Sequence, residues 1–339
     1  MPDMPVTFGC RLPGIATTSV VAAAVLAACL AVAGPAVANE QSFDAWRGAL
    51  RQEALSGGIS AATFDTAFAG VQPIPRIIEL DRSQPEFTMT FPQYLERVVP
   101  QSRIDTARQK LRENQTVLEA IGRKYGVQPR FIVALWGIES DFGRRTGDFS
   151  VVASLATLAY DGRRSEFFRK ELLDALHILE ERHVSADRMI GSWAGAMGQN
   201  QFMPSSFRQY AVDYDGDGRR DIWATRPDIF ASIANYLGSY GWKPDQTWGR
   251  PVRLPSGFDA NLVSLEVEKP MSEWQRLGVR TISGGDLPSR ELMGSVVQPD
   301  GPGGAAFLVY ENYKKIMRWN RSTYFATAVG QLADYIDPQ

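Results

Sequence analysis

The sequence contains very little cysteine and histidine, two residue types on which much enzyme chemistry depends. Cysteine occurs only as Cys10 and Cys29, both in an apolar N-terminal stretch, and histidine only as His177 and His183, both in a charged helical pattern. Removal of the N-terminal stretch would leave no thiol nucleophile and no disulfide. A histidine-rich zinc site and a Ser-His-Asp triad also lack the necessary residues. Thiol catalysis is therefore excluded for a processed chain.

The sequence also lacks an excess of charge of either sign. Its 339 residues carry a formal net charge of −2, and 22% of them are charged. A strongly basic protein would attract nucleic acid through its overall field, whereas a nearly balanced chain does not. We therefore expect no nucleic-acid partner.

Residues 1–38 have the pattern of an export signal. Arg11 is the only positive residue in this stretch, residues 15–33 are mostly apolar, and Ala36 and Ala38 form an A-x-A cleavage pattern. The glycine and proline that follow the apolar run favour cleavage over membrane anchoring. We therefore expect a signal peptide over 1–38 and export to the periplasm.

A second processing signal overlaps the first. Leu26-Ala27-Ala28-Cys29 resembles the bacterial lipoprotein box, in which the cysteine is lipidated and becomes the new N-terminus. Apolar residues continue after Cys29 and would leave an apolar start to the mature chain, which disfavours this alternative. An outer-membrane lipoprotein anchored through Cys29 is therefore the second hypothesis for localisation.

Hydrophobic spacing predicts a helical first part followed by a small sheet. Helical periodicity with glycine or proline at the ends predicts helices over 43–55, 60–68, 91–98, 102–125, 129–140, 165–181, 204–212, 227–240 and 322–336. Short apolar runs predict strands over 252–254, 262–267, 292–297 and 306–310, with a turn over 299–304. The expected fold class is α+β.

One carboxylate, Glu139, ends the apolar run of the helix predicted over 129–140. Burial disfavours the charged form and raises a carboxyl pKa, as a general acid working near neutral pH requires. Asp141 is a poor partner for Glu139, because residues two apart on a helix point to nearly opposite faces. Glu139 is therefore a candidate general acid. The alternative is a helix-end glutamate that reaches solvent or caps a neighbour.

A stretch rich in small residues, 191–206, contains the amides of Gln199, Asn200 and Gln201. Glycine and alanine leave the backbone open to close approach, and amide groups can donate and accept hydrogen bonds. This combination suits a ligand rich in hydroxyl and amide groups, such as a sugar. The alternative is a tight loop that packs against helices.

Three motifs together resemble the lytic murein transglycosylases of family B, glycoside hydrolase family 103. They are Gly137-Ile-Glu-Ser-Asp-Phe-Gly143, Tyr160-Asp-Gly-Arg-Arg164 and Gly195-Ala-Met-Gly-Gln-Asn-Gln-Phe-Met-Pro-Ser-Ser206. Their order and spacing match the family from about Phe43 to the last predicted helix. The third motif is the most specific of the three.

The resemblance implies a domain organisation for the predicted elements. It assigns 39–118 to an N-terminal helical lobe, 119–248 to a lysozyme-like catalytic core, 249–316 to a small antiparallel β lobe, and 317–339 to a C-terminal helix that returns to the core. It also implies peptidoglycan glycan strands as the substrate. Cell-wall synthesis or division proteins are the expected kind of protein partner, and we expect a monomer without an organic cofactor.

The family reaction needs only one acidic residue. Ordinary glycosidases generally use two carboxylates that flank the scissile bond. Members of the family cleave the β-1,4 bond between N-acetylmuramic acid and N-acetylglucosamine without water and leave a 1,6-anhydro-muramyl end. The resemblance implies that Glu139 first protonates the leaving oxygen and then takes the proton of the C6 hydroxyl.

The resemblance also assigns substrate contacts by matching position. Ser192 would orient Glu139 through a hydrogen bond, and Arg163 and Arg164 would hold a peptide-stem or lactyl carboxylate. A solvated helix entrance is the alternative for the two arginines. Sugar contacts are implied for Gln201, Tyr94 and Asn320, and Tyr236 would line the cleft near the acid. Trp319 and Phe325 depart from the family pattern, which often has tyrosine there, so the resemblance does not establish the hydrogen bonds from these two positions.

The segment 213–223 begins like an EF-hand calcium loop. Aspartate stands at the first, third and fifth positions and glycine at the sixth, but Ala224 replaces the usual twelfth-position glutamate. The alternative is a metal-free turn rich in aspartate. We expect a structural Ca²⁺ or Na⁺ site with the ligands Asp213, Asp215, Asp217, Arg219 through its backbone carbonyl, and Asp228.

Three other functions compete with a transglycosylase. A hydrolytic muramidase would need a second carboxylate, such as Asp148 or Asp161. A non-catalytic peptidoglycan-binding scaffold would keep the cleft without turnover. A calcium-regulated interaction protein would depend on the Asp213 loop alone.

Overall fold

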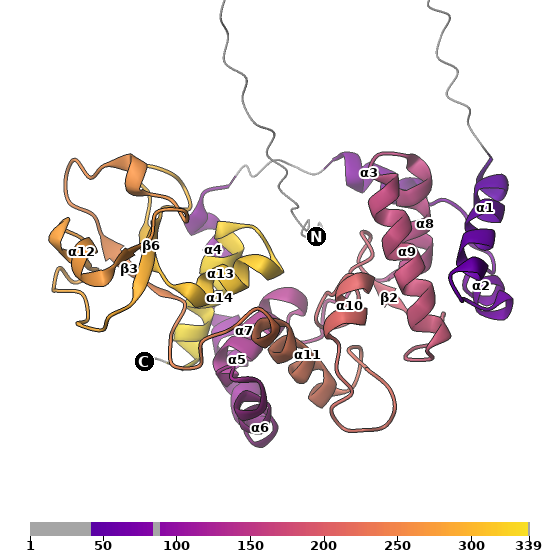
Figure 1. Ribbon diagram of the computed structural model, residues 1–339, viewed down its shortest axis with the longest axis horizontal. Helices are drawn as coiled ribbons and strands as arrows, with labels where there is room; N and C mark the ends of the chain where they lie inside the picture. The colour runs from indigo at the N-terminus through magenta and orange to yellow at the C-terminus, as the bar shows by residue number, and fades with distance from the viewer. Residues whose placement is uncertain (1–41, 84–88, 338–339) are drawn as a thin grey trace, which may run out of the picture.

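The computed structural model describes residues 42–83 and 89–337. The signal-peptide and lipoprotein-box predictions, which rest on residues 1–38 and Cys29, lie outside the described residues. Within them, no helix combines the length and the apolar character needed to cross a membrane. The predicted α+β class is confirmed, because helices dominate the fold and a small antiparallel sheet stands at one end of it (Figure 1).

The first six helices of the described chain precede the central helix α7. Their bounds are α1 Phe43–Ser56, α2 Ala61–Ala67, α3 Pro75–Arg82, α4 Phe91–Val98, α5 Gln101–Glu113 and α6 Gln115–Tyr125. The later helices are α7 Pro129–Ser140, α8 Val151–Asp161, α9 Ser165–Glu180, α10 Pro204–Tyr210, α11 Arg226–Ser239, α12 Met271–Arg276, α13 Glu311–Trp319 and α14 Thr323–Ile336.

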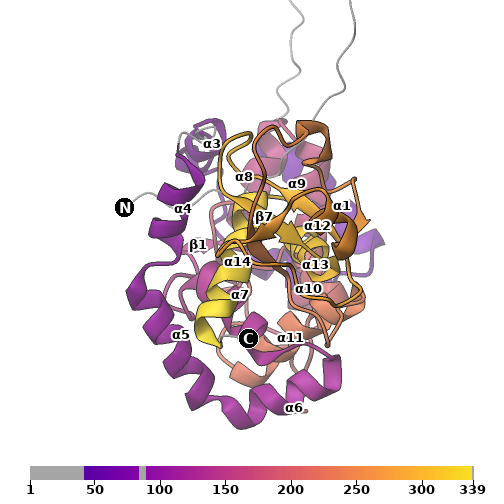
Figure 2. The ribbon, with the colours of Figure 1, turned by 90° about the vertical axis from the view of Figure 1, so that its left-hand side faces the viewer.

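The helix that carries Glu139 forms where the sequence predicts it. Pro129 occupies the first turn of α7, where its missing N–H costs no hydrogen bond, and Asp141 ends the helix in a left-handed conformation with φ 53°. Every residue of α7 except Pro129 and Glu139 is buried. Such a helix needs neighbours on all sides, and α5, α6, α11 and α14 provide them. Figure 2 shows α4, α5 and α6 in an arc that passes around α7 and α14.

Helix α8 was missed by the sequence analysis. Its residues from Val151 to Ala159 are all buried, so the segment shows no polar face and no helical periodicity. It packs against α9 and α3, and α9 confirms the helix predicted over 165–181.

The single helix predicted over 102–125 is wrong in one detail. The chain leaves the helical conformation at Asn114, where φ is −117°, and divides into α5 and α6. The Asn114 side-chain amide donates to the Lys110 carbonyl at 2.8 Å and so caps α5. This local side-chain bond competes with continuation of the helix.

The β lobe contains a five-stranded antiparallel sheet in the order β4-β6-β7-β3-β5. Its strands are β3 Gly249–Arg253, β4 Lys269–Pro270, β5 Arg280–Thr281, β6 Met293–Val297 and β7 Ala306–Val309, and a separate pair joins β1 Phe149–Ser150 to β2 Ile190–Gly191. The turn predicted over 299–304 does join β6 to β7. The strand predicted over 262–267 is wrong, because a 3₁₀ turn, Ala260–Leu262, and bends occupy most of it.

The two faces of β7 belong to two hydrophobic cores. Phe307 and Val309 join the large core formed by the helices, whereas Ala306 and Leu308 join a smaller core inside the β lobe. Successive side chains of a strand point to opposite faces, so this alternation places the sheet between the cores. Burial on both faces explains why the strand reads as an uninterrupted apolar run.

Helix α14 holds the β lobe against the helices through one close contact. Trp248, just before β3, is fully buried, and its indole N–H donates to Asp334 Oδ2 at 2.9 Å. A Cβ at Gly330 of α14 would lie 2.1 Å from the Trp248 ring. Only glycine therefore leaves room for the tryptophan at this crossing.

We predict that Gly330→Ala lowers the free energy of unfolding by about 1–3 kcal/mol, because the added methyl group forces the indole or α14 to move. Thermal denaturation followed by circular dichroism measures the effect. Gly48→Ala is the matched control, because a Cβ there in α1 meets nothing within 4 Å. Alanine is the better helix former, so the control should keep or gain stability by about 0.5–1 kcal/mol. Equal stability of Gly330→Ala and the native protein would contradict the packing argument.

Candidate active site

A cavity of about 820 Å³ lies at the C-terminal end of α7. Its walls come from three parts of the chain: the α4–α5 junction with Arg103, the end of α7 with Glu139, and the small-residue stretch with Ser192 and Gln201. The predicted acid and two of its predicted neighbours therefore share one cavity. Ligand sites in proteins are commonly cavities of this size.

Glu139 is enclosed by protein and keeps a small part of its surface open to the cavity. Burial raises the pKa of its carboxyl to about 8, and a hydrogen bond from Trp319 opposes part of this rise. The carboxyl is therefore mostly protonated at neutral pH. That protonation state is the one that a general acid requires.

Trp319 supplies the hydrogen bond that orients Glu139. Its indole Nε1–H donates to Glu139 Oε1 at 2.6 Å, across a sequence separation of 180 residues. The absence of tyrosine left a hydrogen bond from this position unestablished, and the structure shows that tryptophan makes one, because an indole N–H is a donor just as a phenol O–H is. The aromatic character of the position was the available signal, but the sequence could not show where the ring points.

Two tyrosines surround this pair. The Tyr236 ring packs edge-on against Trp319 with 4.8 Å between centroids, and its hydroxyl donates to the Arg318 carbonyl at 2.7 Å. Tyr236 thus supports Glu139 through Trp319. Burial raises the pKa of the Tyr94 hydroxyl, and the nearby charge of Glu139 raises it further, which places Tyr94 beside the acid.

The predicted hydrogen bond between Ser192 and Glu139 is replaced by another. The Ser192 hydroxyl accepts from the Ala196 N–H at 3.1 Å and closes the turn of the small-residue stretch. Ser192 still lines the cavity, but among the described residues Trp319 is the side chain that donates to Glu139. The orienting role predicted for Ser192 therefore passes to Trp319 in this structure.

Of the three consecutive amides, only Gln201 faces the cavity. Its Nε2 donates to the Thr146 carbonyl at 3.1 Å and to the Gly198 carbonyl at 2.9 Å. Gln199 is held between Trp136 and Trp223, and Asn200 is buried with its amide on the Ile229 carbonyl. Two of the amides therefore fix the loop, as the alternative expects, whereas sugar binding by Gln201 stays a prediction.

The structure does not bring Arg163 and Arg164 to the cavity. Both ion-pair with the buried Asp81 of α3, on the side of α8 and α9. Asn320 follows Trp319 in the turn between α13 and α14, where its Oδ1 accepts the Ser322 N–H at 3.0 Å. Phe325 is buried in the large core.

The two aspartates named as a second acid have different positions. Asp148 is exposed and lines the cavity that holds Glu139. Asp161 ion-pairs with Arg82 at 2.8 Å and is not part of the cavity wall.

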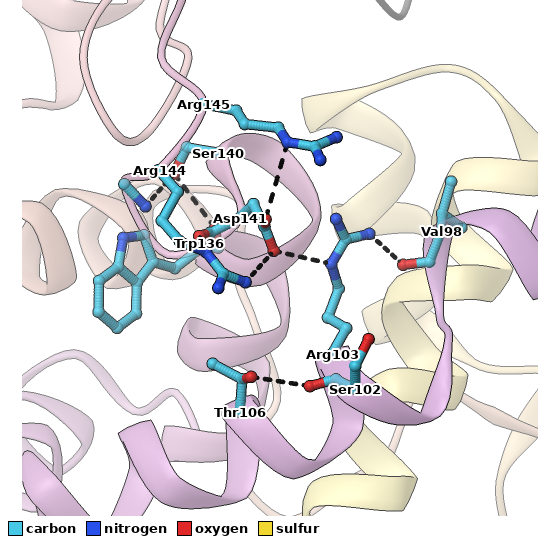
Figure 3. A network of polar contacts seen from close by, with 10 residues as sticks. Val98, Ser102, Arg103, Thr106, Trp136, Ser140, Asp141, Arg144 and Arg145 are labelled. Atoms are coloured by element: carbon cyan, nitrogen blue, oxygen red, sulfur yellow. Dashed lines mark hydrogen bonds and ion pairs between the residues drawn. The ribbon is translucent and has the colours of Figure 1, made fainter. Parts of the chain in front are cut away.

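Asp141 belongs to an ionic cluster (Figure 3). Its Oδ1 accepts from Arg103 Nε at 3.3 Å and from Arg144 at 2.9 Å, and its Oδ2 lies 3.8 Å from Arg145 Nε. Burial alone would raise the pKa of Asp141, but the arginines outweigh it and hold the pKa below the usual value. Asp141 is therefore a charged anchor for arginines, in agreement with its poor position as a partner of Glu139.

The acidic loop brings three carboxylates together. Ligand atoms of Asp213, Asp215 and Asp217 lie within 4.8 Å of one another, and all three residues are at least partly exposed. Carboxylate oxygens are the donors that calcium prefers, so the residues fit a hard cation.

Asp228 holds the acidic loop through hydrogen bonds, and its role as a metal ligand stays a prediction. It is fully buried, and its two carboxylate oxygens accept the Tyr214 and Asp221 N–H groups at 2.8 Å each. Asp228 therefore ties the two ends of the acidic loop together and is not part of the three-carboxylate group. Arg219 donates its N–H to Asp217 Oδ1 at 2.8 Å, and nothing in the described residues tests its carbonyl as a ligand.

Comparison with known proteins identifies relatives of this chain. The family described as "Transglycosylase SLT domain" matches residues 42–334. Membrane-bound lytic murein transglycosylase B of Escherichia coli (strain K12) is 36% identical over 220 residues, which cover 62% of this chain and 58% of that protein. The match thus spans less than two thirds of the curated relative.

Two solved structures show the same overall arrangement. SltB3 from Pseudomonas aeruginosa, in complex with NAG-anhNAM-pentapeptide, is 50% identical with a TM-score of 0.85, over 88% of this chain and 80% of that one. The Escherichia coli lytic transglycosylase SLT35 in complex with calcium is 25% identical with a TM-score of 0.73, over 86% of this chain and 92% of that one.

The raised pKa of Glu139 predicts a pH-dependent stability. The native protein keeps a proton that the unfolded chain loses above its ordinary pKa of 4.5, so stability falls as the pH rises from there to about 8. Glu139→Gln should remove this loss and keep the Trp319 hydrogen bond. We expect a gain in unfolding free energy on the order of 2–4 kcal/mol at pH 8 and little at pH 4.5.

Chemical denaturation at the two pH values measures this difference. Glu96→Gln, at an exposed position of α4, is the control and should change little at either pH. A gain of Glu139→Gln that is the same at both pH values would show that the native carboxyl has an ordinary pKa.

Proposed function

This chain belongs to the Transglycosylase SLT domain family, and from that premise we propose that it is a lytic transglycosylase that cleaves the glycan strands of peptidoglycan. The observation that carries the proposal is Glu139, a buried carboxyl with a pKa of about 8 on the wall of a cavity. The bond that we propose to be cut is the β-1,4 bond between N-acetylmuramic acid and N-acetylglucosamine.

In the first step, Glu139 acts as the general acid. Because Trp319 donates to Oε1, the proton of the neutral carboxyl resides on Oε2. Oε2 gives this proton to the leaving glycosidic oxygen as the bond to C1 breaks. The N-acetyl group of the muramyl sugar assists at C1 on the opposite side.

In the second step, the same residue acts as the base. The Glu139 carboxylate takes the proton of the muramyl C6 hydroxyl while that oxygen bonds to C1, displaces the assisting N-acetyl oxygen and closes the 1,6-anhydro ring. The acid is thereby restored, and no water is consumed. The Trp319 hydrogen bond stabilises the carboxylate between the two steps, since it lowers the pKa of Glu139.

The other residues predicted from the sequence contact the substrate or support Glu139 in this proposal. Gln201 contacts the muramyl sugar, and Tyr94 provides a wall for the sugar ring, since aromatic faces suit the C–H faces of sugars. Tyr236 and Trp319 hold the acid in place. Asn320 follows Trp319 directly and is the remaining proposed contact.

A hydrolytic muramidase is the second candidate, because Asp148 lines the same cavity and could activate a water molecule. Its product would have a reducing end in place of an anhydro end. The two products differ in mass by one water.

We predict that the native protein releases 1,6-anhydro-muramyl products from purified cell-wall sacculi, as measured by mass spectrometry. Glu139→Gln should lower turnover by at least about 10³-fold, because general acid and base catalysis are both lost. Binding of the glycan strand should persist in this variant. Asp148→Asn is the control and should keep most of the activity. Products one water heavier, together with an inactive Asp148→Asn, would instead establish the muramidase.

We also propose that Asp213, Asp215 and Asp217 hold a structural Ca²⁺. Three carboxylates within 4.8 Å of one another repel, and a divalent cation would offset this repulsion. The ion would fix the loop next to α11, whose first turn contains Asp228. Export of the protein to the periplasm through residues 1–38 remains part of the proposal.

We predict that Ca²⁺ raises the melting temperature of the chelator-treated protein, since a ligand that binds only the native state stabilises it. Asp215→Asn should reduce the increase, whereas Asp286→Asn, at an exposed aspartate of the β lobe, should not. Differential scanning fluorimetry with and without a chelator measures both. If chelation left the melting temperature unchanged but altered partner binding, the structural role would be wrong.

A further inference from the structure

The cavity that holds Glu139 has an excess of positive charge. Within the described residues its wall contains four arginines, Arg97, Arg103, Arg144 and Arg145, but only two aspartates besides the neutral Glu139. Three of the arginines converge on one carboxylate, that of Asp141 (Figure 3). One negative charge cannot neutralise three guanidinium groups.

The three arginines around Asp141 are not equivalent. Arg103 is buried, with 11% of its side chain exposed, and another of its N–H groups donates to the Val98 carbonyl. Arg144 and Arg145 keep 61% and 68% of their side chains exposed. Arg145 lies 3.8 Å from Asp141, which is longer than a hydrogen bond. A guanidinium has five N–H donors, so Arg144 and Arg145 retain donors for a ligand.

The charges of this cluster also oppose one another. Burial lowers the pKa of Arg103, Asp141 raises it, and Arg144 and Arg145 lower it again by repulsion. A carboxylate that entered between Arg144 and Arg145 would reduce this repulsion. Among charge-assisted hydrogen bonds, arginine–carboxylate pairs with two parallel hydrogen bonds are the strong ones.

The loop that carries the two arginines is fixed relative to Glu139. The Gly143 N–H donates to the Ser140 hydroxyl at 3.1 Å, and the Arg145 N–H donates to the Ser140 carbonyl at 2.8 Å. Both bonds attach the loop to the last residue of α7, directly after Glu139. The backbone of the loop that carries Arg144 and Arg145 is therefore held next to Glu139.

We infer that Arg144 and Arg145 form a carboxylate-binding site that holds the acidic peptide stem of the muramyl sugar beside Glu139. This inference rests on the proposed function and names the part of the substrate that this side of the cavity recognises. It transfers to Arg144 and Arg145 the role predicted from the sequence for Arg163 and Arg164, which are engaged by Asp81 outside the cavity. Asp141 is a positioning residue in this site, because it holds the arginines and does not contact the ligand.

The test compares two ligands, NAG-anhNAM with its pentapeptide and NAG-anhNAM alone, in Glu139→Gln, which binds without turnover. We expect the pentapeptide ligand to bind more tightly, and the added substitutions Arg144→Gln and Arg145→Gln to remove about ten-fold or more of that preference. Binding of the peptide-free ligand should change little. Isothermal titration calorimetry at low and high salt should also show that salt weakens the preference, because ions screen exposed charges.

Two control variants in the same background make the result specific. Arg144→Lys with Arg145→Lys keeps the charge but loses the two-pronged donor geometry, so it should retain part of the preference. Arg123→Gln with Arg276→Gln removes two arginines that are 74% and 77% exposed and do not line the cavity, and this variant should retain the whole preference. Melting curves verify that each variant is folded.

The outcomes separate this inference from the proposed function. If the Arg144 and Arg145 variant weakened both ligands equally, or left the preference unchanged, the carboxylate site would be wrong and the transglycosylase proposal would stand. If Glu139→Gln bound neither ligand, both proposals would be overturned.

Discussion

The burial of one carboxyl at the end of an apolar helix is the constraint on which the site depends. A charged Glu139 would be costly in this surrounding, so the residue stays neutral with a pKa of about 8. Its helix, α7, is buried on all sides and is enclosed by α5, α6, α11 and α14. The helical core therefore holds the protonated carboxyl at a fixed place on the wall of a cavity of about 820 Å³.

Glu139 and Asp141 are only two residues apart, but their pKa values shift in opposite directions because α7 ends between them. Glu139 remains in the helical conformation and faces the cavity and Trp319. Asp141 adopts a left-handed conformation, and its side chain meets Arg103, Arg144 and Arg145 instead. The Glu139 carboxyl is buried and mostly uncharged, whereas the Asp141 carboxylate lies in an ionic cluster.

The β lobe contributes to the site although it does not line the cavity. Strand β7 ends at Val309, α13 begins at Glu311, and Trp319 is the last residue of α13. The sheet is packed between two cores, so the start of α13 is fixed and the indole reaches Glu139. The contact of Trp248 with Gly330 in α14 holds the same lobe against the helices.

The sequence by itself determined the local features: helix α7 with Glu139 at its end, the α+β class, the small-residue stretch and the acidic loop. These follow from hydrophobic period, proline and glycine positions and local charge, which act over a few residues. Only the tertiary structure decided which distant groups meet: Trp319 with Glu139, Arg163 with Asp81, and Arg103 with Asp141. Helix α8 also escaped the sequence analysis, because a segment buried on every side has no periodic pattern. The partners of a buried polar group are chosen by packing between segments far apart in the chain, and local pattern contains no information about that packing.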